Sequence, residues 1–88
     1  MREYIVEYLG AVFFFYVCVI TSNALAIGAA LALALYVSQS ISSGGFNPAF
    51  TLVKWLKGSI PVSAVPGYLI AQLAAVVTVY QIYKRLKK

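Results

Sequence analysis

The sequence predicts an all-α membrane protein built from three transmembrane helices and one re-entrant half-helix. Its 88 residues are 62% hydrophobic and 10% charged, and a soluble domain of this size cannot bury so much apolar surface. A polar stretch that is rich in Gly and broken by Pro, residues 42–51, interrupts the apolar sequence near its middle. We therefore expect a single membrane domain, 1–88, with a re-entrant loop and half-helix at about 42–58 and spans at about 4–22, 24–41 and 61–83.

The first span corresponds to the apolar run over residues 4–22, which contains Glu7. The run is as long as the ~17–25 residues that cross a bilayer. The alternative is a secretory signal peptide, for which Arg2 supplies the positive start and Ala24 ends a passable cleavage site. Glu3 and Glu7 disfavour such a start, and the run is longer than the apolar part of a usual signal peptide. We therefore expect a membrane span here.

The second span is expected over residues 24–41, which are rich in Ala and Leu. The preceding residues 21–23 are Thr, Ser and Asn, and such a tight polar turn makes the first two spans antiparallel neighbours. Gly28 and several Ala residues allow another helix to approach closely. Ala and Leu alternate over residues 29–35 as in a strand, but the length of the run and the propensities of both residues favour a helix.

The half-helix is expected to begin at Asn47, whose side-chain oxygen can cap the first turn. Pro48 then occupies the first helical position, where its missing N–H costs nothing. Gly58 is placed to end the helix, and Pro61 lies just beyond it. The resulting length of ~15 Å is half the ~30 Å thickness of the hydrocarbon core. The segment therefore reads as re-entrant, and backbone of this kind is tolerated at membrane depth only inside protein or beside a cavity.

The third span is expected over residues 61–83. Tyr80 and Tyr83 lie at its end, where amphipathic rings favour the membrane interface. Four basic residues then follow, and we expect them to form a solvated anchor at the membrane surface: Lys84, Arg85, Lys87 and Lys88.

Charge and cysteine content narrow the class of function. The net charge is +5, but the basic residues flank apolar stretches, so we expect anionic lipid headgroups and not nucleic acid as their partner. The sequence contains no His, and Cys18 is its one Cys, which excludes an intrachain disulfide and a metal site of His and Cys. We expect Cys18 to be an ordinary apolar residue of its span. We expect no cofactor and no enzymatic activity.

Basic residues are nearly balanced between the two ends of the expected topology. Three spans place the termini on opposite sides of the membrane. One side then has three basic residues, at 2, 54 and 57, and the other side has four, at 84, 85, 87 and 88. The positive-inside rule then gives almost no preferred orientation. We expect insertion in both orientations; the alternative is one orientation set by the dense basic tail.

A single half-helix would end in mid-membrane with unpaired N–H groups and the positive end of its dipole. Exposure of such an end to lipid is costly. An inverted second copy would bring another Asn47 to the same depth, and two half-helices end to end would cross the bilayer. Several transport folds are inverted repeats in which broken helices meet at the midplane. We therefore expect an inverted homodimer around one pathway.

These features resemble half of an aquaporin, a member of the major intrinsic proteins. Those channels consist of two inverted repeats, each with three spans and a re-entrant Asn-Pro-Ala half-helix. The matching positions run along nearly the whole sequence and include the Glu-x-x-Gly of the first span, the half-helix and the Tyr-x-x-Ala-Gln of the third span: Glu7, Gly10, Gly28, Ser43, Gly44, Gly45, Asn47, Pro48, Ala49, Thr51, Tyr68, Ala71 and Gln72.

The resemblance implies roles for these residues. Asn47, in the signature with Pro48 and Ala49, would donate a hydrogen bond to a permeating oxygen at the midplane. Glu7 and Gln72 would hold the loop, which accords with the cost of roughly 2.5–3.5 kcal/mol for a carboxylate in a span. The alternative is that Glu7 reaches the nearby interface and that Asn47 is a helix cap alone. The carbonyl groups that would line the vestibule are those of Ser43, Gly44, Gly45 and Phe46.

The sequence departs from the family at the narrow part of the pore. The family typically has Arg after its second Asn-Pro-Ala and often an aromatic residue on the second span, whereas the corresponding residues here are Phe50 and Ile27. Ala75 stands where the third span often has Gly. A symmetric dimer would have apolar mouths, which favours glycerol-like solutes or slow conduction, and only the midplane dipoles would exclude cations.

Our main hypothesis is a passive channel for water or small uncharged solutes such as glycerol, formed by an inverted homodimer. By analogy with the family, four such dimers would form an octamer in the membrane. The alternatives are a dual-topology, proton-coupled transporter of small molecules that uses Glu7, a holin-like pore, and a fragment or remnant that does not conduct.

Overall fold

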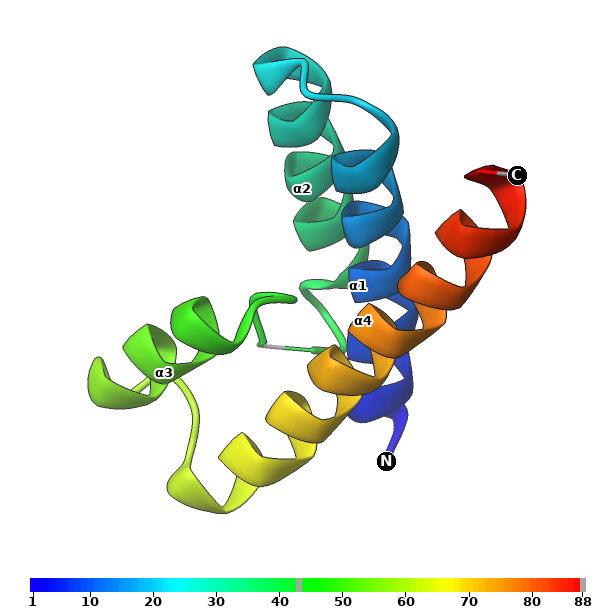
Figure 1. Ribbon diagram of the computed structural model, residues 1–88. Helices are drawn as coiled ribbons and strands as arrows, with labels where there is room; N and C mark the ends of the chain where they lie inside the picture. The colour runs from blue at the N-terminus through cyan, green and yellow to red at the C-terminus, as the bar shows by residue number, and fades with distance from the viewer. Residues whose placement is uncertain (43, 88) are drawn as a thin grey trace.

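The computed structural model describes residues 1–42 and 44–87, so the prediction for Ser43 lies outside the described residues. The chain forms a first helix α1 (Arg2–Ile20), a second helix α2 (Ala24–Ser38) and a short helix α3 (Pro48–Leu56). A 3₁₀ turn η1 (Val62–Ala64) then leads directly into α4 (Val65–Lys87). Figure 1 shows α1 and α2 side by side, α4 crossing α1, and α3 projecting from the side of the first half of α4.

The turn between α1 and α2 comprises the polar residues 21–23. Thr21 ends α1 in an extended conformation and donates its backbone N–H to the Val17 carbonyl at 3.2 Å. Asn23 caps α2, because its side-chain oxygen accepts the Ala26 N–H at 2.9 Å. These two ends leave room for only a short connection, so the two helices run antiparallel.

The lengths of the helices differ from those expected for the spans. In the described part of the chain, two helical stretches, Arg2–Ile20 and Val62–Leu86, are long and apolar enough to cross a membrane. The 15 residues of α2 extend ~22 Å. This helix ends at Ser38 and not near residue 41. After it, the Ile41 and Ser42 N–H groups both bind the Ser38 carbonyl, at 2.9 Å each.

The fourth helix begins later and ends later than the span expected over 61–83. Pro61 is extended and caps the 3₁₀ turn, and Pro66 falls in the first turn of α4, where a residue without an N–H is tolerated. Lys84, Arg85 and Lys87 continue the helix, since Lys and Arg are good helix formers and cations are favourable at a helix C-terminus.

Small residues fill the contact between α1, α2 and α4. Ala11, Ala34 and Ala75 are buried and pack around the fully buried ring of Phe46. Ala75, which stands where the third span of the resembled family often has Gly, is fully buried. Across the α1–α4 contact, the Tyr8 and Thr78 hydroxyl groups lie 2.5 Å apart. Because Thr78 can donate to the Ala74 carbonyl at 3.0 Å, Tyr8 donates to Thr78.

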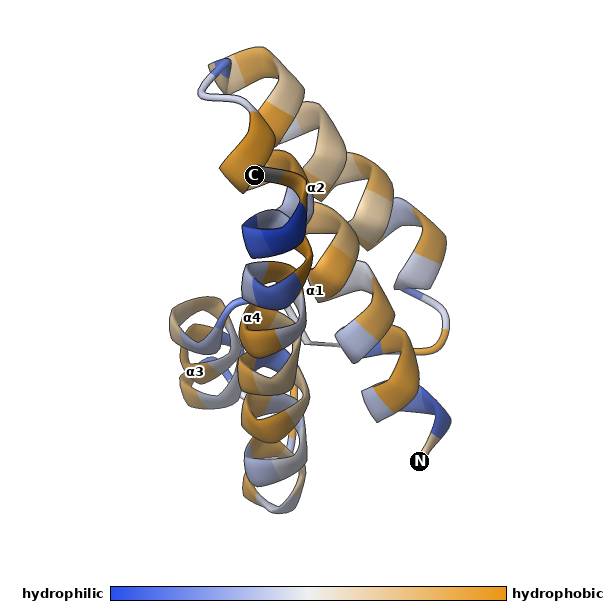
Figure 2. Ribbon diagram, turned by 45° about the vertical axis from the view of Figure 1, so that its right-hand side comes forward, coloured by the Kyte–Doolittle hydropathy of each residue, from blue (hydrophilic) through white to orange (hydrophobic). Residues whose placement is uncertain are grey.

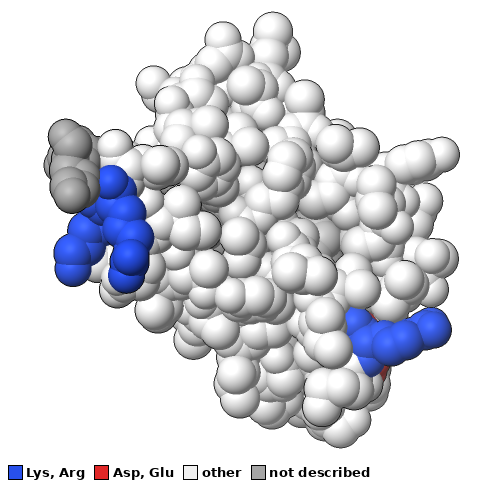
Figure 3. All heavy atoms as spheres, turned by 90° about the vertical axis from the view of Figure 1, so that its right-hand side faces the viewer, with Lys and Arg blue, Asp and Glu red and all other residues white. Residues whose placement is uncertain are grey.

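The outer surface is apolar along the helices and charged at their ends. Large hydrophobic side chains are exposed on all four α-helices, among them Leu9, Leu25, Leu56 and Ile70, and Figure 2 shows hydrophobic residues around each ribbon. On the face in Figure 3, basic side chains gather at two distant places with an uncharged surface between them. The longest dimension of the chain is 42 Å, close to the ~40–45 Å of a bilayer with its headgroups.

Two glycines of this fold provide a matched test of its packing. A Cβ at Gly10 would lie 2.3–3.0 Å from ring atoms of Phe46, whereas a Cβ at Gly28 would meet nothing within 4 Å. Since the Phe46 ring is fully buried, we expect Gly10→Ala to lower the free energy of unfolding by ~1–3 kcal/mol. Thermal unfolding in detergent, followed by circular dichroism, would measure the change.

Gly28→Ala is the control for this substitution. It makes the same chemical change in a helix but without the clash, and Ala is the better helix former by ~1 kcal/mol. We expect it to leave the unfolding temperature unchanged or to raise it. Equal stability of the two variants would contradict the packing of Phe46 on Gly10.

Candidate pore-lining site

The N-terminal end of α3 is defined by Asn47 and Pro48. The side-chain oxygen of Asn47 accepts the Ala49 N–H at 2.8 Å and the Phe50 N–H at 3.4 Å. Its backbone carbonyl accepts the Thr51 N–H at 2.9 Å, and Pro48 occupies the first turn. The predicted cap is confirmed. Asn47 is also exposed, and since its oxygen is used in capping, its NH₂ group is the part of the amide that can donate outward.

The other end of α3 closes with a glycine in a left-handed conformation. Gly58 has φ +91°, and its N–H binds the Trp55 carbonyl at 3.0 Å while that of Ser59 binds the Lys54 carbonyl at 2.8 Å. This pair of bonds is the Schellman arrangement, which satisfies the last carbonyl groups of a helix. The prediction that Gly58 ends the helix is confirmed. The nine residues of α3 therefore extend only ~14 Å.

Glu7 connects three segments that are distant in sequence. Its side chain is fully buried. One carboxylate oxygen accepts the Ser42 hydroxyl at 2.8 Å, and the other accepts the Gln72 amide at 2.7 Å and the backbone N–H of Phe46. A buried carboxylate must have its lone pairs satisfied, and here neutral donors from the loop and from α4 supply the hydrogen bonds.

Gln72 extends this network to the half-helix. It is fully buried, and its NH₂ group donates to Glu7 and, at 2.6 Å, to the hydroxyl of Thr51. Thr51, also fully buried, is one turn after Asn47 on α3. Among the described residues the Gln72 carbonyl oxygen has no hydrogen-bond partner. The carboxylate on α1 and the amide on α4 thus fix the loop and the half-helix together.

Glycines allow the loop to approach Glu7 and α1. A Cβ at Gly44 would lie 2.6–2.8 Å from the Glu7 carboxylate group, and one at Gly45 would lie 2.6–2.9 Å from the side chain of Phe50. Phe46 adopts φ +64°, in the left-handed region, which is strained for a bulky residue. Its short bond to Glu7 and the burial of its ring on Gly10 compensate that strain.

The predicted site residues fall into two groups in the structure. The loop-anchoring pair Glu7 and Gln72 is in direct contact, and the residues Asn47 to Phe50 begin α3. Ile27, predicted at a pore mouth with Phe50, is half-buried on α2. Figure 1 shows the N-terminal end of α2 far from α3, so one copy of the chain does not bring these two residues together.

Sequence reasoning assigned no role to Ser42, and it noted Thr51 without a function. Both supply hydroxyl groups to the buried network. A signal existed for each: Ser42 opens the polar loop, and Thr51 follows Asn47 by one helical turn. What the sequence does not show is that both side chains converge on Glu7 and Gln72.

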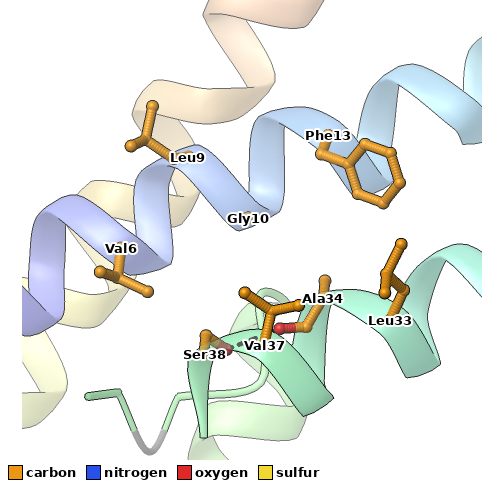
Figure 4. Close-up of a pocket in the computed structure, with 8 residues that line it drawn as sticks. All are labelled: Val6, Leu9, Gly10, Phe13, Leu33, Ala34, Val37 and Ser38. Atoms are coloured by element: carbon orange, nitrogen blue, oxygen red, sulfur yellow. Dashed lines mark hydrogen bonds between the residues drawn. The ribbon is translucent and has the colours of Figure 1, made fainter. Parts of the chain in front are cut away.

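A groove between α1 and α2 is a concave feature outside this network. Its volume is about 400 Å³, and Figure 4 shows apolar side chains of α1 facing those of α2 across it. Ser38 contributes a hydroxyl group, which already donates to the Ala34 carbonyl at 2.7 Å. Because the lining offers no free polar group to guide a polar solute, the groove suits an acyl chain or another helix better than a permeant.

Glu7→Gln tests the anchoring network. The three hydrogen bonds would lose their charged acceptor, and a neutral amide has one oxygen where the carboxylate has two. We expect the free energy of unfolding to fall by ~1–3 kcal/mol, measured by thermal unfolding in detergent. Glu3→Gln is the control, because Glu3 lies on the same helix but binds only the exposed N-terminal amine. Unfolding temperatures equal to the parent for both variants would refute the network.

Comparisons with known proteins identify the family of this chain. The model of the family described as "Major intrinsic protein" matches residues 1–88. Aquaglyceroporin-2 of Trypanosoma brucei brucei is 38% identical over 85 residues, which cover 82% of this chain and 27% of that protein. Glycerol uptake facilitator protein-like 6 of Lactiplantibacillus plantarum is 37% identical over 82 residues, which cover 83% of this chain and 38% of that protein.

A third relative, the propanediol uptake facilitator PduF of Salmonella typhimurium, is 43% identical over 47 residues, or 53% of this chain and 18% of that protein. The chain therefore spans between about a fifth and two fifths of the length of these curated relatives. No solved structure is significantly similar to it.

The family match confirms three predictions made from the sequence. The predicted resemblance to the major intrinsic proteins is confirmed over the whole sequence given, and with it the all-α class and the location in a membrane. The chain belongs to the major intrinsic protein family, whose members are integral membrane channels and not enzymes.

Proposed function

We propose that this chain supplies one half of a passive channel for water or small uncharged solutes such as glycerol. The observation that carries the proposal is the exposed N-terminal end of α3. There Asn47 uses its oxygen to cap the helix and keeps its NH₂ group for a permeating oxygen. The positive end of the helix dipole lies at the same point.

The proposed topology has three spans and a half-helix. The α1, α2 and α4 helices would cross the membrane, and α3, at ~14 Å, would reach from one surface to about its middle. The domain comprises residues 1–88, with the loop and half-helix at about 42–58. The carbonyl groups of Gly44, Gly45 and Phe46 would line the vestibule, together with that of Ser43.

The proposed partner for the half-helix is a second copy in the inverted orientation. Asn47 pairs the first N–H groups of α3, but its own NH₂ group and the positive end of the helix dipole would still be costly against lipid. An inverted copy would place a second Asn47 opposite the first. The balance of Arg2, Lys54 and Lys57 against the basic tail supports insertion in both orientations. Four such dimers would form an octamer. Another chain or the remainder of a longer protein could supply the second half instead.

Two arguments indicate the permeant: the side chains expected at the two mouths of the pore, and the names of the related proteins. Ile27 and Phe50 would make both mouths apolar, with carbonyl groups and Asn47 as the polar partners. This pattern suits a solute with hydroxyl groups on one side and a hydrocarbon backbone on the other. The names of the relatives, an aquaglyceroporin and uptake facilitators for glycerol and propanediol, support the same class of solute.

A proton-coupled transporter that uses Glu7 is less well supported. The three hydrogen bonds that the described residues make to Glu7 hold the loop or α4 in place, and its side chain is fully buried. An anchoring residue of this kind suits a static pore. A holin-like function does not account for the capped half-helix.

Asn47→Asp tests the proposal that Asn47 donates a hydrogen bond to a permeating solute at the midplane. Aspartate still caps a helix, so assembly should persist, but the side chain loses its NH₂ donor and gains a charge. We expect glycerol uptake into proteoliposomes, followed by stopped-flow light scattering, to fall about tenfold or more, which corresponds to the loss of ~1.4 kcal/mol of favourable interaction.

The matched control is Asn23→Asp, because Asn23 caps α2 in the same way. We expect its glycerol uptake to equal that of the parent. If Asn47→Asp also conducted like the parent, Asn47 would be a helix cap and nothing more.

A further inference from the structure

Lys54 is a charged residue in the last turn of the short helix α3. It is half-buried, whereas Lys57 at the end of the same helix is exposed. Asn47, Phe50 and Lys54 follow one another at intervals of three and four residues, so they share one face of α3. Because the C-terminal end of α3 lies at one membrane surface in the proposed topology, Lys54 would stand at a mouth of the pathway.

The aromatic ring of Phe50 positions this charge. The Lys54 ammonium group lies 5.4 Å from the centroid of the ring, a cation–π distance. The Phe50 side chain itself lies close against the backbone of Gly45, where a Cβ would come within 2.6–2.9 Å. The ammonium group, the ring and the loop backbone are therefore neighbours, and Phe50 holds the charge beside the loop.

The carbonyl groups of the loop would attract cations, and the charge of Lys54 would oppose them. Carbonyl oxygens in a row replace the water shell of a cation, which is how cation-selective filters work. A vestibule lined by loop carbonyl groups would therefore attract cations as far as the midplane, where the positive dipole ends oppose them. A fixed ammonium group within the ~8 Å Debye length of physiological salt opposes their entry, while it leaves uncharged solutes unaffected.

We propose that Lys54, held by Phe50, is the residue that makes this pore reject cations while it passes uncharged solutes. The inference rests on the proposed channel function and adds a charge filter at each mouth of the inverted dimer. It assigns Phe50 a second role, since the ring both narrows the mouth and fixes the ammonium group.

Urea and guanidinium provide the test, because they have nearly the same shape and hydrogen-bonding groups but differ by one charge. Uptake of each radiolabelled compound into proteoliposomes would be measured for the parent, Lys54→Gln, Lys54→Arg and Lys57→Gln. We expect Lys54→Gln to raise guanidinium uptake on the order of tenfold with urea uptake unchanged. Lys54→Arg and the exposed control Lys57→Gln should keep the ratio of the parent.

Glycerol uptake by the parent separates a failure of the proposed channel function from a failure of the role proposed for Lys54. If the parent takes up no glycerol and no urea, the channel function itself is wrong. If the parent conducts both and Lys54→Gln leaves the guanidinium-to-urea ratio unchanged, the channel stands and the role of Lys54 is refuted.

A second variant covers the case in which Lys54→Gln does not conduct. Lys54→Cys in a Cys18→Ser background can be labelled with a cationic or a neutral thiol reagent of similar size. We expect the cationic label alone to lower guanidinium uptake to the level of the parent. An equal effect of both labels would show that size and not charge matters, and would overturn the proposal.

Discussion

The buried carboxylate of Glu7 is the interaction on which the arrangement of this chain depends. A charge inside a span is tolerated only with strong partners, and these come from Ser42, Phe46 and Gln72. The loop must therefore pass close to α1, which requires Gly44 and places Phe46 in a left-handed conformation. Once the loop is fixed, α3 begins at a defined position beside α4.

The same anchoring leaves the beginning of α3 exposed, and the proposed function follows from that exposure. Thr51, one turn into the half-helix, is buried and contacts Gln72, while Asn47 at the beginning of the half-helix is exposed. Rigid support on one side and an available donor on the other is the arrangement that a permeation site requires. It also explains why one copy looks incomplete: the exposed end and the apolar outer faces both require further protein or lipid.

Much of this fold was predictable from local chemistry, because caps and turns depend on neighbouring residues. The roles of Asn47, Pro48 and Gly58 at the ends of α3 follow from residue type and position, and the polar residues before Ala24 predict the turn. The sequence did not predict that α2 ends at Ser38 or that α4 begins at Val65, because both positions depend on where the chain turns back on itself. The network of Glu7 with Gln72 was expected from the family resemblance, but the parts of Ser42 and Thr51 require three-dimensional proximity that no spacing reveals.

The most direct test of the account is the osmotic shrinkage of proteoliposomes that contain only this chain, followed by stopped-flow light scattering at several temperatures. A pore predicts shrinkage faster than that of protein-free vesicles, with a low activation energy, because water then crosses without dissolving in lipid. It also predicts the same low activation energy for glycerol entry. Rates and activation energies equal to those of protein-free vesicles for both solutes, with the protein shown to be folded and inserted, would contradict the claim that this chain alone forms a channel.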